Sequence, residues 1–456
     1  MKTALMIAAP TSGSGKTTIA RGLMALLTSK GMKVQPFKCG PDYIDTKFHE
    51  AVTGRPSINL DTFMASLEHV RELFMQYGSD ADVCIVEGMM GFFDGYDRER
   101  GSSYEIARVL DIPVVLVVDA KSAAYSMAAL LSGFIHFRED VQIAGVIFNK
   151  VGSEKHFVML RQVCEDLGIE CFGYLPKSPA LEQGSRYLGL DFSEQAESKE
   201  LVRLLEEHVR WQALREALFT VDSGQWTVDT IHCPQSKVLL ARNDESFSFL
   251  YQETLDLFSS VRFFDPENDV PDLSDIDLLY LPGGYPEKHL KALVRNEACR
   301  KAIKAFAEKG GRIIAECGGM MYLCQSIVTD EGECPMCGVL PYKISARKAD
   351  RKLSLGYRRF MLDGKEYRGH EFHYTQFVGE TPASVTQVYN AKGEPVDTPV
   401  FRYKNVLASY THLGPTPSCS LVQAAMSARA SSLLPSAGFL NKTAISLPPS
   451  RHRIWP

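Results

Sequence analysis

Residues 9–18 are Ala9-Pro10-Thr11-Ser12-Gly13-Ser14-Gly15-Lys16-Thr17-Thr18, and they follow an apolar run that begins at Ala4. This order predicts a buried strand, a glycine-containing phosphate loop and the start of a helix, as in the G-x4-G-K-[ST] motif. Glycines let backbone N–H groups turn toward phosphate oxygens, and the helix N-terminus adds positive potential. The stretch therefore predicts an α/β nucleotide-binding domain.

Each residue type in this loop has an expected task. Lys16 should reach the terminal phosphates, and the Thr17 hydroxyl should ligate Mg²⁺. Asn149, which ends a later apolar run, is a candidate for recognition of the adenine edge. Pro10 stands where the general motif has its first glycine. The expected nucleotide-binding residues are Gly13, Ser14, Gly15, Lys16, Thr17, Thr18 and Asn149.

Apolar runs of strand length alternate with helical patterns on both sides of a polar segment. The first series has expected strands at Ala4–Ala9, Val83–Glu87, Val114–Asp119 and Ala144–Asn149, and expected helices at Thr17–Lys30 and Ser122–Phe134. The second has expected strands at Val238–Ala241, Leu278–Leu281 and Arg312–Ala315, and expected helices at Phe247–Ser259 and Glu297–Lys309. Such alternation is typical of doubly wound parallel sheets with both faces covered.

These patterns predict an α/β chain of two doubly wound domains. We expect a first domain of residues 1–219, a linker of residues 220–237 and a second domain of residues 238–413. A single charged helix is expected from Glu197 to Phe219. Residues 414–456 are rich in Ala, Ser and Pro and are expected to form an atypical, disordered tail.

Composition narrows the class of protein. The chain has 456 residues, 50 Lys+Arg against 55 Asp+Glu, and 45% hydrophobic residues, which excludes a disordered or fibrous chain. The slightly acidic balance argues against a nucleic-acid binder. No apolar run reaches the ~18 residues that a membrane span needs. We therefore expect a cytoplasmic protein with no membrane or nucleic-acid partner, and a homodimer as the candidate assembly.

Acidic residues lie near the expected carboxyl edge of the first sheet. Glu87 ends the strand Val83–Glu87, and open α/β sheets place their ligands at that edge. Asp45 lies in the segment Lys38-Cys39-Gly40-Pro41-Asp42-Tyr43-Ile44-Asp45. Such acids alone are more often caps or turn residues, but beside a phosphate loop they point to a metal. We expect Thr17, Asp45 and Glu87 to hold Mg²⁺.

A second constellation lies in the later half of the chain. Cys317 follows an expected strand and precedes Gly318 and an expected helix, so its thiol should be exposed on a tight turn. The helix N-terminus should lower the pKa of that thiol. Gly283 and Gly284 can present N–H groups to an oxyanion. His412 is the candidate base, and together these residues predict a Cys–His hydrolase.

Six motifs in this order resemble the cobyrinic acid a,c-diamide synthase family. The resemblance runs from Met1 to about Leu413, and Pro10 is the residue that this family has at its position. The matching stretches are Ala9–Thr18, Lys38–Asp45, Glu87–Gly95, Leu281–Glu287, Glu316–Tyr322 and Gly369–Tyr374. The resemblance implies a P-loop NTPase-like ligase domain of the dethiobiotin synthetase type, followed by a class I glutamine amidotransferase-like domain.

The resemblance also implies a mechanism, with ATP and Mg²⁺ as cofactors and with cobyrinic acid and L-glutamine as substrates. Cys317 and His412 would release ammonia from glutamine. The ligase domain would phosphorylate the a and c acetate carboxylates of the corrin, and ammonia would then attack. The implied substrate-binding residues are Lys38, Tyr43, Ile44 and Asp45 on the corrin side and Gly283 and Gly284 on the glutamine side.

The chain departs from the family pattern just after the candidate base. The family subgroup commonly continues with His-Leu-His-Phe, whereas this chain reads His412-Leu413-Gly414-Pro415. The orientation of His412 and the glutaminase activity are therefore open. Other hypotheses are amidation of hydrogenobyrinic acid or nickel-sirohydrochlorin, a P-loop ATPase switch, and a binding protein with impaired glutaminase activity.

Overall fold

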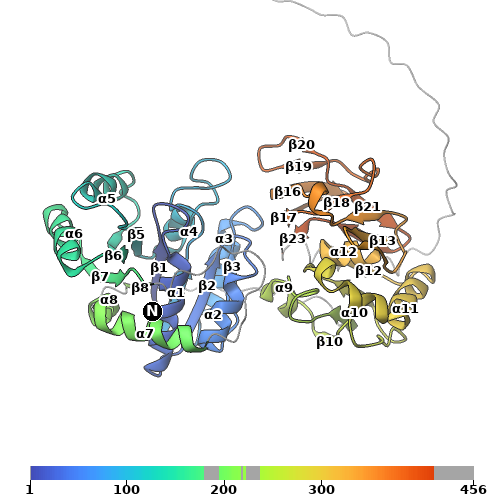
Figure 1. The fold of residues 1–456 in the computed structure, drawn as a ribbon, viewed down its shortest axis with the longest axis horizontal. Coiled ribbons are helices and arrows are strands. Elements are labelled where there is room, and N and C mark those ends of the chain that lie inside the picture. Colours follow the sequence, from blue (N-terminus) through green and yellow to red (C-terminus); the bar gives the residue numbers. More distant parts are fainter. Residues whose placement is uncertain (1, 179–194, 217–218, 222–236, 415–456) are drawn as a thin grey trace, which may run out of the picture.

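The computed structural model describes residues 2–178, 195–216, 219–221 and 237–414. Two α/β domains lie side by side, the first in blue to green and the second in yellow to red (Figure 1). Among these described residues, no helix is long and apolar enough to cross a membrane.

The first domain is built on a sheet with the strand order β3-β2-β4-β1-β5-β6-β7, in which all of these neighbours are parallel. The strands are β1 (Lys2–Ala8), β2 (Val34–Cys39), β3 (Ile58–Leu60), β4 (Val83–Glu87), β5 (Val114–Asp119), β6 (Ile143–Val151) and β7 (Cys171–Pro176). The helices are α1 (Lys16–Ser29), α2 (Asp45–Thr53), α3 (Leu67–Tyr77), α4 (Ser103–Leu110), α5 (Met127–His136), α6 (Glu154–Leu167), α7 (Gln195–His208) and α8 (Trp211–Glu216).

Alternate residues of β1 enter two different apolar cores. Ala4, Met6 and Ala8 pack in the core that includes residues of α3, α4, α5 and α6. Leu5 and Ile7 pack in the core that includes residues of α1 and α7. Because successive strand residues point to opposite faces, the continuous apolar run that the sequence shows is what a sheet covered on both faces requires.

The second domain has a six-stranded sheet with the order β10-β9-β11-β12-β22-β21. Only β21 is antiparallel to its neighbour. Its strands are β9 (Lys237–Ala241), β10 (Ser260–Phe264), β11 (Leu278–Leu281), β12 (Ile313–Glu316), β21 (Val400–Tyr403) and β22 (Val406–Ser409). The helices are α9 (Gln252–Asp256), α10 (Leu290–Arg295), α11 (Glu297–Glu308) and α12 (Gly318–Leu323).

One face of this sheet packs against further strands that the sequence analysis did not predict. Val238, Leu240 and Ile314 share a core with Phe360 and Tyr367 of a five-stranded sheet. That sheet contains β16 (Ser354–Leu362), β17 (Lys365–His373), β19 (Val388–Asn390), β20 (Pro395–Val396) and β23 (His412–Leu413). A four-stranded sheet contains β13 (Ser326–Thr329), β14 (Gly332–Pro335), β15 (Lys343–Ser345) and β18 (Gln376–Phe377).

The α/β class is confirmed, and several element boundaries differ from the expected ones. The helix expected from Glu197 to Phe219 is two helices, α7 and α8, because Val209 pairs with Gly173 of β7 and interrupts it. The helix expected at Phe247–Ser259 is reduced to α9. At the expected linker, β8 (Phe219–Val221) pairs with β1, and β9 starts at Lys237. Residues 222–236 and 415–456, which include nearly all of the linker and the tail, lie outside the described residues.

Side chains from both domains meet in a polar and aromatic interface. The Tyr357 hydroxyl donates to Asp61 at 2.7 Å, and the Lys47 ammonium donates to the Asp244 carbonyl at 3.1 Å. Tyr43, Phe63 and Met64 of the first domain form one apolar cluster with Phe249 and Tyr251 of the second. The segment that follows β2 is therefore held against the second domain.

Candidate active sites

The phosphate loop joins β1 to α1, as the sequence predicts. Gly15 has φ +95°, and a Cβ at this position would lie 2.1 Å from Asn149 Nδ2, so only glycine fits here. No side chain caps the first turn of α1, which leaves this helix end suited to phosphate oxygens. Lys16 Nζ donates to the Met90 carbonyl at 2.6 Å. The loop thus has the geometry of an anion site with its lysine nearby.

Asn149 lies against the phosphate loop. Its Nδ2 donates to the Ser14 carbonyl at 2.9 Å, and its Oδ1 accepts from the Lys150 N–H at 2.8 Å. These bonds fix the backbone of the loop. A contact between Asn149 and adenine stays a prediction, as does any contact from Thr18.

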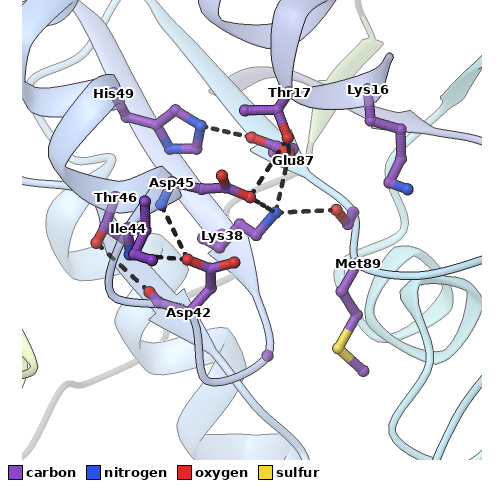
Figure 2. Close-up of polar contacts among 12 residues, drawn as sticks. Lys16, Thr17, Lys38, Asp42, Ile44, Asp45, Thr46, His49, Glu87 and Met89 are labelled. Carbon is purple, nitrogen blue, oxygen red and sulfur yellow. Dashed lines mark hydrogen bonds and ion pairs between the residues drawn. The ribbon is translucent and has the colours of Figure 1, made fainter. Parts of the chain in front are cut away.

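The structure brings together the three expected metal ligands around one lysine ammonium (Figure 2). Thr17 Oγ1 donates to Glu87 Oε1 at 2.6 Å and to Asp45 Oδ2 at 3.4 Å. Lys38 Nζ donates to the same two carboxylates, at 2.6 Å to Asp45 Oδ2 and 2.8 Å to Glu87 Oε1. Lys38, Asp45 and Glu87 are all buried. The carboxylates therefore already bind a cation, which is the chemistry that a Mg²⁺ ion requires.

The charges in this cluster support one another. Burial alone would lower the pKa of Lys38, but Asp45 and Glu87 outweigh it and raise that pKa above its ordinary value. Burial alone would raise the pKa of Glu87, but Lys38 and His49 outweigh it and lower that pKa. Glu87 is therefore a carboxylate and Lys38 an ammonium at neutral pH.

Two residues near this cluster were not assigned a role by the sequence analysis. A hydrogen bond of 2.6 Å joins His49 Nε2 to Glu87 Oε2, and another of 3.0 Å joins His49 Nδ1 to Ser57 Oγ. Asp42 Oδ1 accepts from the N–H groups of Ile44 and Asp45 at 2.8 and 2.9 Å. The sequence did contain a signal for His49. It lies four residues after Asp45, and residues four apart share one face of a helix.

Cys317 occupies a strained turn between β12 and α12. Its φ of 45° and ψ of −108° are rare for a residue with a side chain, and such strain concentrates at functional sites. Its N–H donates to the Ser409 carbonyl at 2.8 Å. A Cβ on the next residue, Gly318, would lie 2.9 Å from the Gly284 nitrogen. The expected nucleophile and the expected oxyanion donors thus lie side by side.

The structure places His412 beside Gly283, in the short strand β23. A Cβ on Gly283 would lie 2.1 Å from His412 Cε1, so glycine is needed here for a close approach rather than for a turn. The imidazole stacks on His370 with ring centroids 5.1 Å apart. Within the described part of the chain, the buried Nδ1 of His412 has no hydrogen-bond partner, and no hydrogen bond joins His412 to Cys317.

Protonation at this second site differs from our expectation. The sequence analysis expected an exposed thiol with a lowered pKa, but the Cys317 side chain is buried. Burial raises the pKa of Cys317, and the neighbouring Glu287 adds to the effect. Burial lowers the pKa of His412 well below its ordinary value, with a further contribution from His370. The resting pair is therefore a neutral thiol and a neutral imidazole, so the base has to take the proton during attack.

Glu316, beside the nucleophile, gives a test of these electrostatics. Burial raises its pKa from the ordinary 4.5 to about 8, and Oε1 accepts from the Tyr280 hydroxyl at 2.8 Å. Because the pKa of the Glu316 carboxyl is higher in the folded protein than in the unfolded chain, its protonation stabilises the fold fully below pH 4.5. This stabilisation is lost as the pH rises through about 8. We expect Glu316→Gln, which is always neutral, to match the parent's melting temperature at pH 5. Near pH 9 its melting temperature should exceed the parent's by several degrees, since each kcal/mol of unfolding free energy shifts it by roughly 2–4 °C. A difference that does not change with pH would contradict this assignment.

Of the implied corrin-side residues, Tyr43 lies at the domain interface, whereas Lys38 and Asp45 lie in the buried carboxylate cluster of the first domain. A cavity of about 370 Å³ between the domains is lined in part by Tyr43, Thr46, Lys47 and Arg242. The Tyr43 side chain is 8% exposed and packs mainly among aromatic rings of the second domain, while Ile44 is half-buried. Contact of Tyr43, Ile44, Lys38 or Asp45 with a corrin stays a prediction.

Comparison with known proteins agrees with a nucleotide site in the first domain and a cysteine site in the second. Residues 5–190 match the family model described as the CobQ/CobB/MinD/ParA nucleotide binding domain, and residues 242–416 match the CobB/CobQ-like glutamine amidotransferase domain. A cobyrinate a,c-diamide synthase of Caldanaerobacter subterraneus subsp. tengcongensis is 40% identical over 90% of this chain and 94% of its own. A hydrogenobyrinate a,c-diamide synthase of Brucella abortus is 38% identical over 90% of this chain and 97% of its own.

Proposed function

This chain belongs to the family of cobyrinate and hydrogenobyrinate a,c-diamide synthases, and we propose that it amidates the a and c acetate carboxylates of cobyrinic acid with ATP and glutamine. The observation that carries the proposal is the pairing of two sites in one chain. In the first domain the phosphate loop adjoins a carboxylate cluster, since Thr17 donates a hydrogen bond to Glu87. In the second domain Gly318, the residue after Cys317, lies against Gly284, and the adjacent Gly283 lies against the His412 ring.

In the first domain, the loop N–H groups and Lys16 would bind the ATP phosphates. Thr17, Asp45 and Glu87 would hold Mg²⁺, since the two carboxylates already share one cation, the Lys38 ammonium, and the Thr17 hydroxyl donates to both of them. The metal would neutralise charge on the phosphate oxygens. A corrin carboxylate oxygen would attack the γ-phosphorus, forming an acyl phosphate and releasing ADP. Ammonia would then attack the carbonyl carbon, and phosphate would leave with the former carboxylate oxygen.

In the second domain, the Cys317 sulfur would attack the side-chain amide carbon of glutamine while His412 accepts the thiol proton. The N–H groups at Gly283 and Gly284 would stabilise the oxyanion. His412 would then protonate the leaving nitrogen, so that ammonia departs and a thioester remains. Water would hydrolyse the thioester to glutamate and restore the thiol.

The choice of tetrapyrrole is tested by direct competition. We expect cobyrinic acid to be converted to its a,c-diamide, with hydrogenobyrinic acid and nickel-sirohydrochlorin as the alternative substrates. Mass spectrometry of an equimolar mixture with ATP, Mg²⁺ and ammonium would report which of them is amidated first. Preferential amidation of either alternative would overturn the cobyrinate assignment while leaving the ligase chemistry in place. A cytoplasmic location and a homodimeric assembly stay predictions.

The sequence after Leu413 predicts weak use of glutamine. Two residues after His412 the chain has Gly414, where the family subgroup commonly has His, and the imidazole Nδ1 lacks a partner within the described residues. Loss of a well-placed base costs ~10²–10⁴-fold in rate. We expect a chain whose residues after Leu413 are replaced by a family-like His-Phe ending to gain about that factor with glutamine and little with ammonium. Equal glutamine-dependent rates in the two chains would show that the present ending is tolerated.

A further inference from the structure

Glu316 is a buried carboxyl group that links the backbones of the candidate nucleophile and the candidate base. It directly precedes Cys317 and is 4% exposed. Its Oε1 atom accepts hydrogen bonds from the Tyr280 hydroxyl at 2.8 Å and from the Leu413 N–H at 3.4 Å. Leu413 directly follows His412 in β23. The carboxyl group therefore joins the end of β12, where the nucleophile begins its turn, to the strand that contains the base.

This carboxyl group and the thiol lie on opposite faces of the sheet. Cys317 belongs to the apolar core that includes residues of α11 and α12. Ile314, Tyr280 and Leu413 belong to the core on the other face. Because successive strand residues alternate between faces, Glu316 shares the face of Ile314, as its two hydrogen bonds also require. A negative charge on Glu316 therefore lies on the side of β23 and not among the groups around the thiol.

The cation that forms on His412 during attack is disfavoured by its surroundings. As the Cys317 sulfur bonds to the amide carbon of glutamine, the thiol proton moves to the imidazole, which becomes positively charged. Burial lowers the pKa of His412, and His370 and His373 lower it further. Within the described residues, the Nδ1 atom of His412 has no hydrogen-bond partner. A carboxylate close to this ring would favour its charged form.

Glu316 is the group in this region that can supply such a charge. In the described part of the chain no ion pair involves Glu316, and burial raises its pKa to about 8. The titratable groups that face it are hydroxyls and a thiol, from Tyr280, Tyr43, Tyr251 and Cys317. Burial raises the pKa values of Tyr43, Tyr251 and Cys317 above their ordinary values. A carboxyl group buried without a cation destabilises the fold once it ionises, and such groups are typical of functional sites.

Resting on the proposed function, we infer that Glu316 is a positioning residue of the glutaminase, which holds His412 toward Cys317 and, as a carboxylate, stabilises the imidazolium. The bond from the Leu413 N–H fixes the backbone next to the base. Ionisation strengthens that bond, because an N–H donates more strongly to a carboxylate than to a neutral carboxyl group. Glutamine hydrolysis therefore accelerates as the pH rises through about 8.

The test is the pH dependence of glutamate release by the full chain. In the parent, kcat should rise about tenfold as the pH passes about 8, since a nearby opposite charge favours a charged form by about one pKa unit or more. Glu316→Gln keeps the shape and the acceptor oxygen but lacks the charge. It should match the parent at about pH 6 and lack the rise, with an unchanged KM for glutamine. A merely structural role would instead lower kcat by the same factor at every pH.

Tyr280→Phe gives a second, directional measurement. Burial raises the pKa of Glu316, and the hydrogen bond from the Tyr280 hydroxyl opposes this effect. Loss of that hydroxyl should therefore move the rise in kcat toward higher pH by about one unit. A rise that stays at the parent's pH in Tyr280→Phe would show that Glu316 is not the group that ionises.

Glu333→Gln is the matched control for loss of a carboxylate. Glu333 lies in β14 of the same domain and pairs with Lys343 at the surface, so this variant should keep the parent's profile. A parent profile without the rise, a rise that persists in Glu316→Gln, or its loss in Glu333→Gln would each overturn the inference. Ammonium-dependent amidation should be the same in all four chains at each pH. Its absence from the parent would instead overturn the proposed function.

Discussion

Cys317→Ser is expected to abolish glutamine-dependent amidation while leaving ammonia-dependent amidation intact. The serine hydroxyl is a far poorer nucleophile than the thiol, and His412, whose pKa burial lowers, is a weak base for activating it. Removal of a nucleophile can cost on the order of 10³-fold or more. Ammonia bypasses the thioester, so the acyl phosphate formed in the first domain still becomes an amide. The measurement is the initial rate of corrin amidation with each nitrogen source.

Cys334→Ser provides the matched control. Cys334 lies in β14 of the same domain and is half-buried, away from the strained turn at Cys317. It should retain both activities. Glutamine-dependent amidation by Cys317→Ser at the parent's rate would place the nucleophile elsewhere.

Lys16→Ala should remove amidation with both nitrogen sources and leave glutamine hydrolysis largely in place. Its ammonium lies at the start of α1, within 2.6 Å of the Met90 carbonyl, where the terminal phosphates are expected. Loss of a positive charge that stabilises phosphoryl transfer costs ~10²–10³-fold. Glutamate release is measured in the same reaction, because the cysteine site is in the other domain.

Lys30→Ala tests whether the effect is specific to the loop. Lys30 follows the other end of the same helix and pairs with Glu206 at the surface. Its loss should change neither activity beyond the small effect of an exposed ion pair. Amidation by Lys16→Ala at the parent's rate would refute the phosphate-loop assignment.

The local sequence pattern was sufficient to predict features that depend on a single strand or helix. The strands expected at Val83–Glu87, Val114–Asp119 and Leu278–Leu281 agree with β4, β5 and β11, because buried parallel strands are continuous apolar runs. Glu87 could be placed near the phosphate loop because adjacent parallel strands end at the same edge of a sheet.

Features that depend on contacts between distant segments could not be predicted in the same way. The cation that joins Asp45 to Glu87 is Lys38, a residue that sequence reasoning assigned to the corrin. The ring of Tyr43 packs on His412, which lies more than 360 positions later in the chain. The raised pKa of Cys317 follows from burial by the assembled domain, whereas the helix end next to it is visible in the sequence.

The central claim is that nitrogen from glutamine reaches a corrin carboxylate within this one chain. Glutamine labelled with ¹⁵N in its side-chain amide, ATP, Mg²⁺ and cobyrinic acid would be incubated with the full chain, and the corrin analysed by mass spectrometry. The account predicts a product with ¹⁵N in both new amides, formed more slowly than with ammonium and absent in Cys317→Ser. A corrin that stays unamidated with both nitrogen sources, or ¹⁵N incorporation that persists in Cys317→Ser, would contradict it.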